Sequence, residues 1–258
     1  MERPDHSAAV TFFSADAFAT GASVTLGEDA AQHARVLRIG NGEKVELRDG
    51  RGNAARGILA RVAKRSLSVD VLEVWTIPDL PPVHMLVPVA DRDRMLYLAE
   101  KCTELGATSW RPVIWRRSRS VGPAGDGPAF QSRLKGRMIA ALTQSGGGWL
   151  PEVHPSAPVP RAVAAAPQGT RILLDSDAQS NLISHRLVAP VTIALGPEGG
   201  LDPKERDDMI VAGFIPASLV GGTLRFETAG IAGLALVRSV LGSVSTTRST
   251  RRSVINAP

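Results

Sequence analysis

The sequence predicts an α/β protein with two domains, a compact β-barrel over residues 1–76 and an α/β domain over residues 83–242. Short β-prone segments separated by turn residues fill the first part, which is typical of a small barrel. In the second part, strand-like apolar runs alternate with helix-like segments, which indicates a mostly parallel sheet with helices on both faces. The proline-rich segment 76–82 lies between the two patterns and predicts the domain boundary.

The size and composition of the chain exclude several classes of protein. It has 258 residues, of which 43% are hydrophobic, so it can bury the core of one large or two modest domains. Its apolar runs are far shorter than the roughly 18 residues of a membrane span, and its first residues lack the pattern of a secretory signal. Cys102 is the only cysteine, which excludes an internal disulfide and a Cys/His metal cluster. We therefore expect a cytoplasmic protein with no membrane partner and no metal.

Five strands and one helix are expected in the barrel domain. The clearest strand signal is the alternation of polar and apolar residues over 66–74, and the turn residues at 49–53 predict a hairpin. In the expected helix, Ala30, His33 and Leu37 share one face. The strands are expected at residues 10–13, 23–26, 43–47, 56–62 and 66–74, and the helix at residues 29–37.

The α/β domain contains four clear strand patterns and two clear helix patterns. In the first helix pattern apolar side chains repeat every three to four positions until Gly106 ends it. Cys102 lies on this apolar stripe, so we interpret its thiol as a packing group and not as a nucleophile. The tail 243–258, rich in Ser, Thr and Arg, is expected to be disordered. The strands are expected at residues 83–89, 109–115, 171–175 and 191–195, and the helices at residues 91–105 and 130–142.

Positive charge is concentrated in one part of the chain. The net charge is +5, but residues 92–137 alone carry ten Lys and Arg against four Asp and Glu. Arginine can form paired hydrogen bonds with phosphate, so such a cluster suits a nucleic acid. A solvated basic face is the alternative, and we favour nucleic acid. This stretch contains Arg111, Arg116, Arg117 and Arg119, followed by Arg133, Lys135 and Arg137.

Two turns with charged residues stand out in the α/β domain, and the first of them is rich in glycine. Residues 195–201 (LGPEGGL) follow the expected strand 191–195 and precede Asp202 and Pro203, which suit the N-cap and first position of a helix. Residues 224–229 (LRFETA) follow the apolar run 217–220 and open the apolar segment 229–241. Glycine lets backbone approach a ligand closely, and two such turns can form one concave site. Neither turn matches the dinucleotide fingerprint or the phosphate loop, and the first turn alone also fits a plain strand-to-helix connection.

Together, LGPEGGL and LRFETA closely resemble the signature of the knotted SPOUT methyltransferases, in particular the family that methylates N3 of a uridine in 16S ribosomal RNA. The similarity extends over nearly the whole chain, including residues 33–38, 101–106 and 117–120. The resemblance implies a PUA-like β-barrel at the N-terminus and a SPOUT α/β trefoil-knot domain at the C-terminus. It also implies S-adenosylmethionine as cofactor, 16S ribosomal RNA in the small subunit as substrate, and a homodimer.

The resemblance also implies roles for individual residues. Arg225 would stabilise negative charge that develops on the uracil ring, and Glu227 or Glu198 would accept the N3 proton. A helix N-terminal carboxylate is the alternative role of Glu227, and an ion-pair partner that of Arg225. RNA contacts are implied at His33, Arg35, Arg38, Arg117 and Arg119, although a surface or half-buried role is favoured for His33. The residues implied to hold the cofactor are Leu174, Leu195, Gly196, Pro197, Glu198, Gly199, Gly200, Leu201, Leu219, Gly221, Leu224, Thr228 and Ala229.

Two segments depart from the family pattern. Relatives usually carry Glu and Arg where this chain has residues 143–148, and a basic residue where it has Gly222 and Thr223. Both changes remove charge near the expected RNA-facing edge. Two other functions therefore stay open: a knotted methyltransferase with another target, such as a transfer RNA ribose, and a non-catalytic RNA-binding or ribosome assembly factor.

Overall fold

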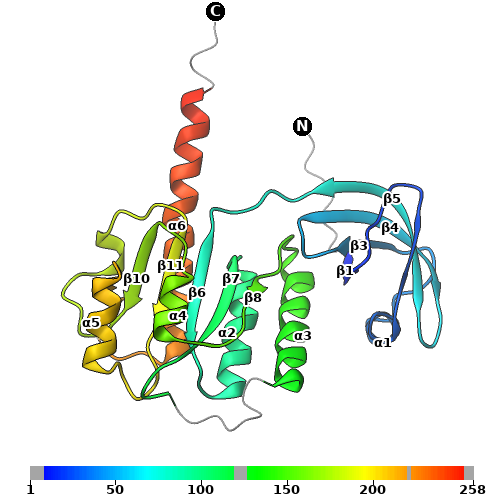
Figure 1. Ribbon diagram of the computed structural model, residues 1–258. Helices are drawn as coiled ribbons and strands as arrows, with labels where there is room; N and C mark the ends of the chain where they lie inside the picture. Colours follow the sequence, from blue (N-terminus) through cyan, green and yellow to red (C-terminus); the bar gives the residue numbers. More distant parts are fainter. Residues whose placement is uncertain (1–8, 119–126, 220–221, 253–258) are drawn as a thin grey trace, which may run out of the picture. The chain divides into compact units, whose positions relative to one another are not determined.

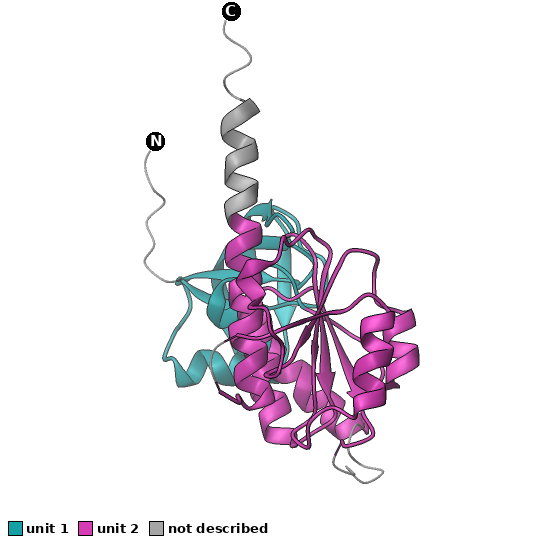
Figure 2. Cartoon of the chain, turned by 90° about the vertical axis from the view of Figure 1, so that its left-hand side faces the viewer, with its two compact units in different colours: residues 1–79, 139–150 teal, residues 80–138, 151–258 magenta. Residues whose placement is uncertain are grey.

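The computed structural model describes residues 9–118, 127–219 and 222–252, with side chains described up to residue 242. The chain divides into two compact units (Figure 2). The first consists of Met1–Asp79 and Ile139–Leu150, and the second of Leu80–Met138 and Pro151–Pro258. The sequence carries no local pattern that predicts the grouping of residues 139–150 with the N-terminal part of the chain.

The first unit contains a five-stranded sheet with the order β1-β3-β4-β5-β2 (Figure 1). All neighbouring strands are antiparallel except β1 and β3, and the sheet forms a half-barrel around an apolar core. In β5 the inward-facing Leu67, Val69 and Val71 are buried, as the polar–apolar alternation predicted. The five predicted strands are confirmed, with ends shifted by up to three residues: β1 Val10–Phe13, β2 Ser23–Leu26, β3 Lys44–Arg48, β4 Asn53–Val62 and β5 Leu67–Thr76.

Helix α1 (Glu28–Val36) confirms the predicted helix, and of its predicted face Ala30 packs against the apolar core while the His33 ring lies edge-on to Phe12 at 5.9 Å. Its buried residues are Ala31 and Ala34, whereas His33 is exposed and Leu37 is 45% exposed. The expected face was therefore wrong for Leu37, and it did not include the two most buried residues of the helix. Two small alanines let the helix approach the sheet closely, and this close packing outweighs the burial of a leucine at the end of the helix.

The predicted turn at residues 49–53 forms the β3–β4 hairpin. Asp49 accepts hydrogen bonds from the backbone amides of Arg51 at 2.7 Å and Asn53 at 3.0 Å. Burial alone would raise the pKa of Asp49, but the hydrogen bonds from Asn53 and Arg51 outweigh it and hold the pKa below its usual value. The carboxylate thus fixes the turn in its charged form.

The segment 145–150 packs on this hairpin within the first unit. The amide of Gly52 donates to the carbonyl of Gly148 at 2.8 Å, and the indole of Trp149 donates to the carbonyl of Ile77 at 2.9 Å. A Cβ at Gly148 would lie 2.6 Å from Ile77, so only glycine permits this approach. Part of the segment that departs from the family pattern therefore has a packing role.

The second unit is built on a parallel sheet with the order β12-β10-β11-β6-β7-β8, and β9 also pairs with β7. Every strand pair is parallel, which confirms the predicted class. All five residues of β11 are buried, as expected of a central strand covered on both faces. The strands are β6 Val83–Pro88, β7 Ser109–Ile114, β8 Glu152–Val153, β9 Ala157–Pro158, β10 Thr170–Leu174, β11 Val191–Leu195 and β12 Ile215–Ala217.

Helices cover both faces of this sheet (Figure 1). On one face, Ala162 of α4 and Met209 of α5 share a buried cluster with Leu173 and Ala194 of the strands. On the other face, α6 packs closely, because a Cβ at its Gly230 would lie 2.9 Å from Leu195. The helices of this unit are α2 Arg92–Glu104, α3 Pro128–Ser145 (whose end belongs to the first unit), α4 Val159–Ala164, α5 Pro203–Val211, the short 3-10 helix η1 Leu182–Ser184, and α6 Phe226–Arg252.

Helix α2 carries the predicted apolar stripe. Met95, Leu98, Ala99 and Cys102 are all buried, and the helix ends before Gly106 at φ +70°. Burial raises the pKa of the Cys102 thiol well above its usual value, so the group stays protonated and acts in packing.

Two features of the second unit differ from the predictions. Helix α6 continues to Arg252, whereas a disordered tail was expected from Ser243; residues 253–258 lie outside the described part. Residues 243–252 contain neither Gly nor Pro, so nothing in them terminates the helix. The short elements α4, β8 and β9 were not predicted, because two to six residues carry no periodicity. None of the described helices is both long and apolar enough to cross a membrane.

Candidate functional site

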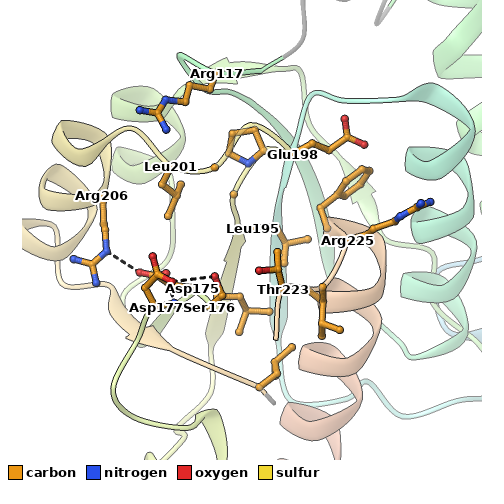
Figure 3. A pocket seen from close by; sticks show the side chains of 18 of the residues that line it. Arg117, Asp175, Ser176, Asp177, Leu195, Glu198, Leu201, Arg206, Thr223 and Arg225 are labelled. Carbon is orange, nitrogen blue, oxygen red and sulfur yellow. Dashed lines mark hydrogen bonds and ion pairs between the residues drawn. The ribbon is translucent and has the colours of Figure 1, made fainter. Parts of the chain in front are cut away.

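A cavity of about 610 Å³ lies in the second unit, where the carboxyl ends of β10 and β11 meet the start of α6 (Figure 3). Ligands of open parallel sheets commonly bind at this edge. The cavity is lined by Arg94, Arg117, Leu174, Asp175, Ser176, Asp177, Leu195, Gly196, Pro197, Glu198, Gly200, Leu201, Arg206, Ala217, Leu219, Gly222, Thr223, Leu224, Arg225, Phe226 and Ala229.

The first predicted turn forms one wall of the cavity. It begins where β11 ends, and Asp202 caps the following helix by accepting from the amide of Lys204 at 3.1 Å, with Pro203 at the first helical position. Inside the turn, the amide of Gly200 donates to the carbonyl of Pro197 at 2.9 Å, and Gly200 has φ +76°. The predicted arrangement of strand, glycine turn and capped helix is confirmed.

The second predicted turn leads into α6. The amide of Ala229 donates to the carbonyl of Arg225 at 2.9 Å, so the helix starts inside the LRFETA segment. Arg225 itself is exposed, and Gly222 before it has φ +118°. Gly222 and Thr223, where the family pattern has a basic residue, also line the cavity.

The structure brings the two turns together around this cavity. Gly199 and Thr228 are outside the lining, and Gly221 lies outside the described residues. The remaining predicted cofactor residues all line it: Leu174, Leu195, Gly196, Pro197, Glu198, Gly200, Leu201, Leu219, Leu224 and Ala229.

Several polar residues of the lining were not among the predicted site residues. Asp175 lies directly after β10, and its carboxylate accepts from Arg206 at 2.7 Å and from the amide of Asp177 at 2.9 Å. Figure 3 shows Asp175 and Arg206 on the opposite side of the cavity from Arg225. The available signal was the position of three polar residues, Asp175 to Asp177, at the carboxyl end of a buried strand.

Arg94 of α2 connects the two turns. Its Nη1 lies 2.5 Å from Glu198 Oε1 in the first turn, and its Nε lies 3.9 Å from Glu227 Oε1 in the second. The two predicted catalytic residues lie differently with respect to the cavity. Arg225 lines the cavity, whereas Glu227 is only 8% exposed and lies outside the lining.

Arg116 and Arg117, which follow β7, form hydrogen bonds and an ion pair with the first turn and the helix after it. The amide of Arg116 donates to the buried carboxylate of Glu205 at 2.9 Å, and the Arg116 guanidinium lies 3.5 Å from Asp202. Arg117 donates to the carbonyl of Gly199 at 3.4 Å. Arg117 was predicted as an RNA contact, and the structure places it at the cavity wall.

Three of the other predicted RNA contacts lie in the first unit. His33 and Arg35 are exposed on α1, and Arg38 is exposed just beyond the helix. Arg35 donates to the carbonyl of Lys64 at 2.8 Å, which holds its side chain beside the sheet. Arg38 has φ +58°, an uncommon value for a residue with a side chain. Arg119 lies outside the described residues.

Two family models match the chain. An RNA methyltransferase domain matches residues 78–238, and an RNA methyltransferase PUA domain matches residues 26–72. The first match covers more than half of the chain and includes every described residue of the cavity.

Individual proteins show the same similarity. The chain is 27% identical to the ribosomal RNA small subunit methyltransferase E of Mycobacterium bovis, over 84% of this chain and 87% of the relative. A crystal structure of the Neisseria gonorrhoeae ribosomal RNA small subunit methyltransferase E, bound to S-adenosyl methionine, is 26% identical with a TM-score of 0.82, covering 90% and 98% of the two chains. A Legionella pneumophila structure at 24% identity has a TM-score of 0.84 over 90% and 97%, which shows the shared fold.

Proposed function

The chain belongs to the RNA methyltransferase family, and from this premise we propose that it transfers a methyl group from S-adenosylmethionine to N3 of a uridine in 16S ribosomal RNA. The observation that carries the proposal is the cavity formed jointly by the LGPEGGL and LRFETA turns. The similarity to two small-subunit methyltransferases, one of them bound to the cofactor, supports both the substrate and the cofactor.

The residues of the cavity fit S-adenosylmethionine. A volume of about 610 Å³ suits a molecule of this size. Leucines 174, 195, 201, 219 and 224 supply apolar surface for the adenine. The turn offers backbone groups that side chains do not cover, and the carboxylates of Asp175 and Asp177 suit an ammonium or ribose hydroxyls. When bound, the cofactor supplies a methyl group already activated on a sulfonium.

Arg225 is the residue proposed to act on the uracil. The N3–H of uridine is weakly acidic, and its loss leaves negative charge on the ring and its carbonyl oxygens. Arg225 is exposed at the cavity, so its guanidinium can reach a base placed there. A fixed cation aimed at developing charge stabilises the transition state more than the ground state.

One of two carboxylates is proposed to take the N3 proton. Glu198 lines the cavity, with a side chain that is 18% exposed, and therefore has access to a bound base. Glu227 is buried and lies outside the lining, and its carboxylate forms an ion pair with Arg94, which does line the cavity. Access favours Glu198 as the acceptor and gives Glu227 a supporting role.

RNA docking is proposed to use residues from both units. The PUA domain match includes His33, Arg35 and Arg38, and Arg117 supplies a cation at the cavity wall. We further infer a homodimer acting in the cytoplasm on the small ribosomal subunit, as the family resemblance implies. The threading of the chain through a knot stays a prediction.

The proposed reaction is tested by transfer of labelled methyl from S-adenosylmethionine to small subunits that lack the modification, followed by identification of the product nucleoside. We expect 3-methyluridine. A ribose-methylated product from transfer RNA would instead support the related knotted enzyme. If no methyl group is transferred and calorimetry detects no cofactor binding, the result would support a non-catalytic RNA-binding or assembly factor.

Replacement of Arg117 by alanine should weaken binding of the small subunit and lower the slope of log affinity against log salt by about one. The physical reason is that one phosphate contact, and the counterion that it displaces, is lost. Lys204→Ala is the control, because Lys204 is an exposed cation already paired with Asp208 at 2.9 Å. An unchanged slope for Arg117→Ala, with weakened cofactor binding, would assign Arg117 to the cofactor alone.

A further inference from the structure

Arg94 is held in a fixed place by the start of its own helix. Asp91 caps α2 by accepting from the backbone amide of Arg94 at 3.1 Å, which fixes the backbone from which the side chain extends. The side chain of Arg94 is 35% exposed, and the residue lines the cavity. A planar guanidinium can direct separate N–H groups at two partners, which an ammonium on a flexible stem does poorly.

Each partner of Arg94 belongs to a different turn of the cavity. Nη1 makes a short, charge-assisted hydrogen bond of 2.5 Å to Glu198. Nε lies 3.9 Å from Glu227, which is close enough for an ion pair but long for a hydrogen bond. The short contact therefore orients the carboxylate of Glu198. The longer contact lets Arg94 compensate the negative charge of Glu227.

Glu227 is suited to anchor Arg94. Its side chain is 10% exposed, and among the described residues no group forms a hydrogen bond with its Oε2 atom, which is fully buried. A buried carboxylate is costly unless a cation or a dipole compensates it. Arg94 supplies the cation, and the N-terminus of α6, where Glu227 lies in the first turn, supplies the dipole.

We propose that Arg94 is a positioning residue of this site: anchored by the buried Glu227, it holds the Glu198 carboxylate at the cavity wall where the proton is accepted. This inference rests on the proposed function and refines it. Glu198 touches the substrate, and Arg94 and Glu227 act through it. Packing of α2 on α6 does not need the bridge, because Leu98 already contacts the backbone of α6 at Gly230.

The test compares Arg94→Met, Arg94→Lys and the wild type in methyl transfer. Arg94→Met should lower kcat by roughly 10- to 30-fold, since a misdirected base loses much of its catalytic effect. The KM for small subunits and the Kd for S-adenosylmethionine should stay within about twofold, because Arg94 acts on the proton transfer and not on binding. Arg94→Lys should recover part of kcat by keeping the contact to Glu198.

A matched control lies on the same helix. Lys101 also bridges two carboxylates, Glu100 at 2.9 Å and Glu104 at 2.7 Å, but it is outside the cavity lining. Lys101→Met should leave kcat unchanged. An Arg94→Met enzyme with normal kcat and a raised KM or Kd would overturn the proposal, since Arg94 would then serve binding.

Double variants test whether the three residues act as one unit. Arg94→Met combined with Glu198→Gln should be no slower than Glu198→Gln alone, and Glu227→Gln should add little to Arg94→Met. Effects on kcat that multiply would overturn the proposal.

Failure of the proposed reaction can be told apart from failure of this inference. If the wild type forms no 3-methyluridine, the proposed function fails, and the bridge is then judged by thermal unfolding. The Tm losses of Arg94→Met and Glu227→Gln should be non-additive in the double variant. Additive losses would show that the two side chains do not interact.

Discussion

Replacement of Arg225 by alanine is expected to lower kcat for methyl transfer by roughly 100- to 1,000-fold, the usual cost of removing a group that stabilises transition-state charge. The affinity for S-adenosylmethionine should change by less than about threefold, because uniform binding and transition-state stabilisation are separable. Arg225 lines the cavity and is exposed, so we expect its guanidinium to approach a uracil bound there. Calorimetry gives the affinity, and single-turnover methyl transfer gives the rate.

Arg225→Lys is the matched variant for this prediction. A lysine keeps the positive charge but loses the planar pair of donors, so kcat should lie between those of the wild type and Arg225→Ala. If Arg225→Ala instead weakened cofactor binding as strongly as it lowered kcat, Arg225 would be a structural part of the pocket. That result would return it to the role of an ion-pair or packing residue.

The local parts of the site could be predicted from the sequence. Strand β11, the cap at Asp202 and the proline at position 203 each depend on a few neighbouring residues, and the structure has them where expected. The apolar stripe of α2 is equally local, since its period alone identifies the face with Cys102. The sequence thus predicts the class of each unit and the two turns of the cavity.

Contacts between distant segments could not be predicted in the same way. Arg94 and Glu198 are 104 positions apart, and no local pattern pairs them. The grouping of residues 139–150 with the first unit depends on contacts such as that of Trp149 with Ile77. The expected place of Leu37 on the packed face of α1 was wrong because packing selected two alanines over this larger apolar residue.

These contacts also change the interpretation of charge in the chain. Arginines 94, 116 and 117 lie in the basic stretch that indicated nucleic acid, yet each has a contact with the LGPEGGL turn or the cap that follows it. Part of the positive charge therefore contacts the turn that forms one wall of the cavity. The proposed RNA contact Arg117 and the proposed cofactor turn thus share one set of contacts, so variants in this stretch need measurements of both RNA affinity and cofactor affinity.

Replacement of Gly200 by valine is expected to weaken S-adenosylmethionine binding by roughly 10- to 100-fold. Gly200 has φ +76°, where a residue with a side chain costs about 1–2 kcal/mol and a β-branched one more. About 1.4 kcal/mol corresponds to a tenfold change in Kd. To relieve the strain the turn must change its backbone, which displaces the neighbouring lining residues Glu198 and Leu201.

Gly200→Asn separates backbone conformation from crowding. A Cβ at Gly200 would lie 3.8 Å from the nearest heavy atom, the Nη1 of Arg117, so the space accepts a side chain. Asparagine tolerates the left-handed region of backbone conformation. The Kd of the Gly200→Asn variant for S-adenosylmethionine, measured by calorimetry, should therefore stay within about threefold of the wild-type value. Equal losses for valine and asparagine would mean that the ligand itself needs the space beside Gly200. In that case the close approach of the cofactor to the backbone, and not the shape of the turn, is the reason for glycine at this position.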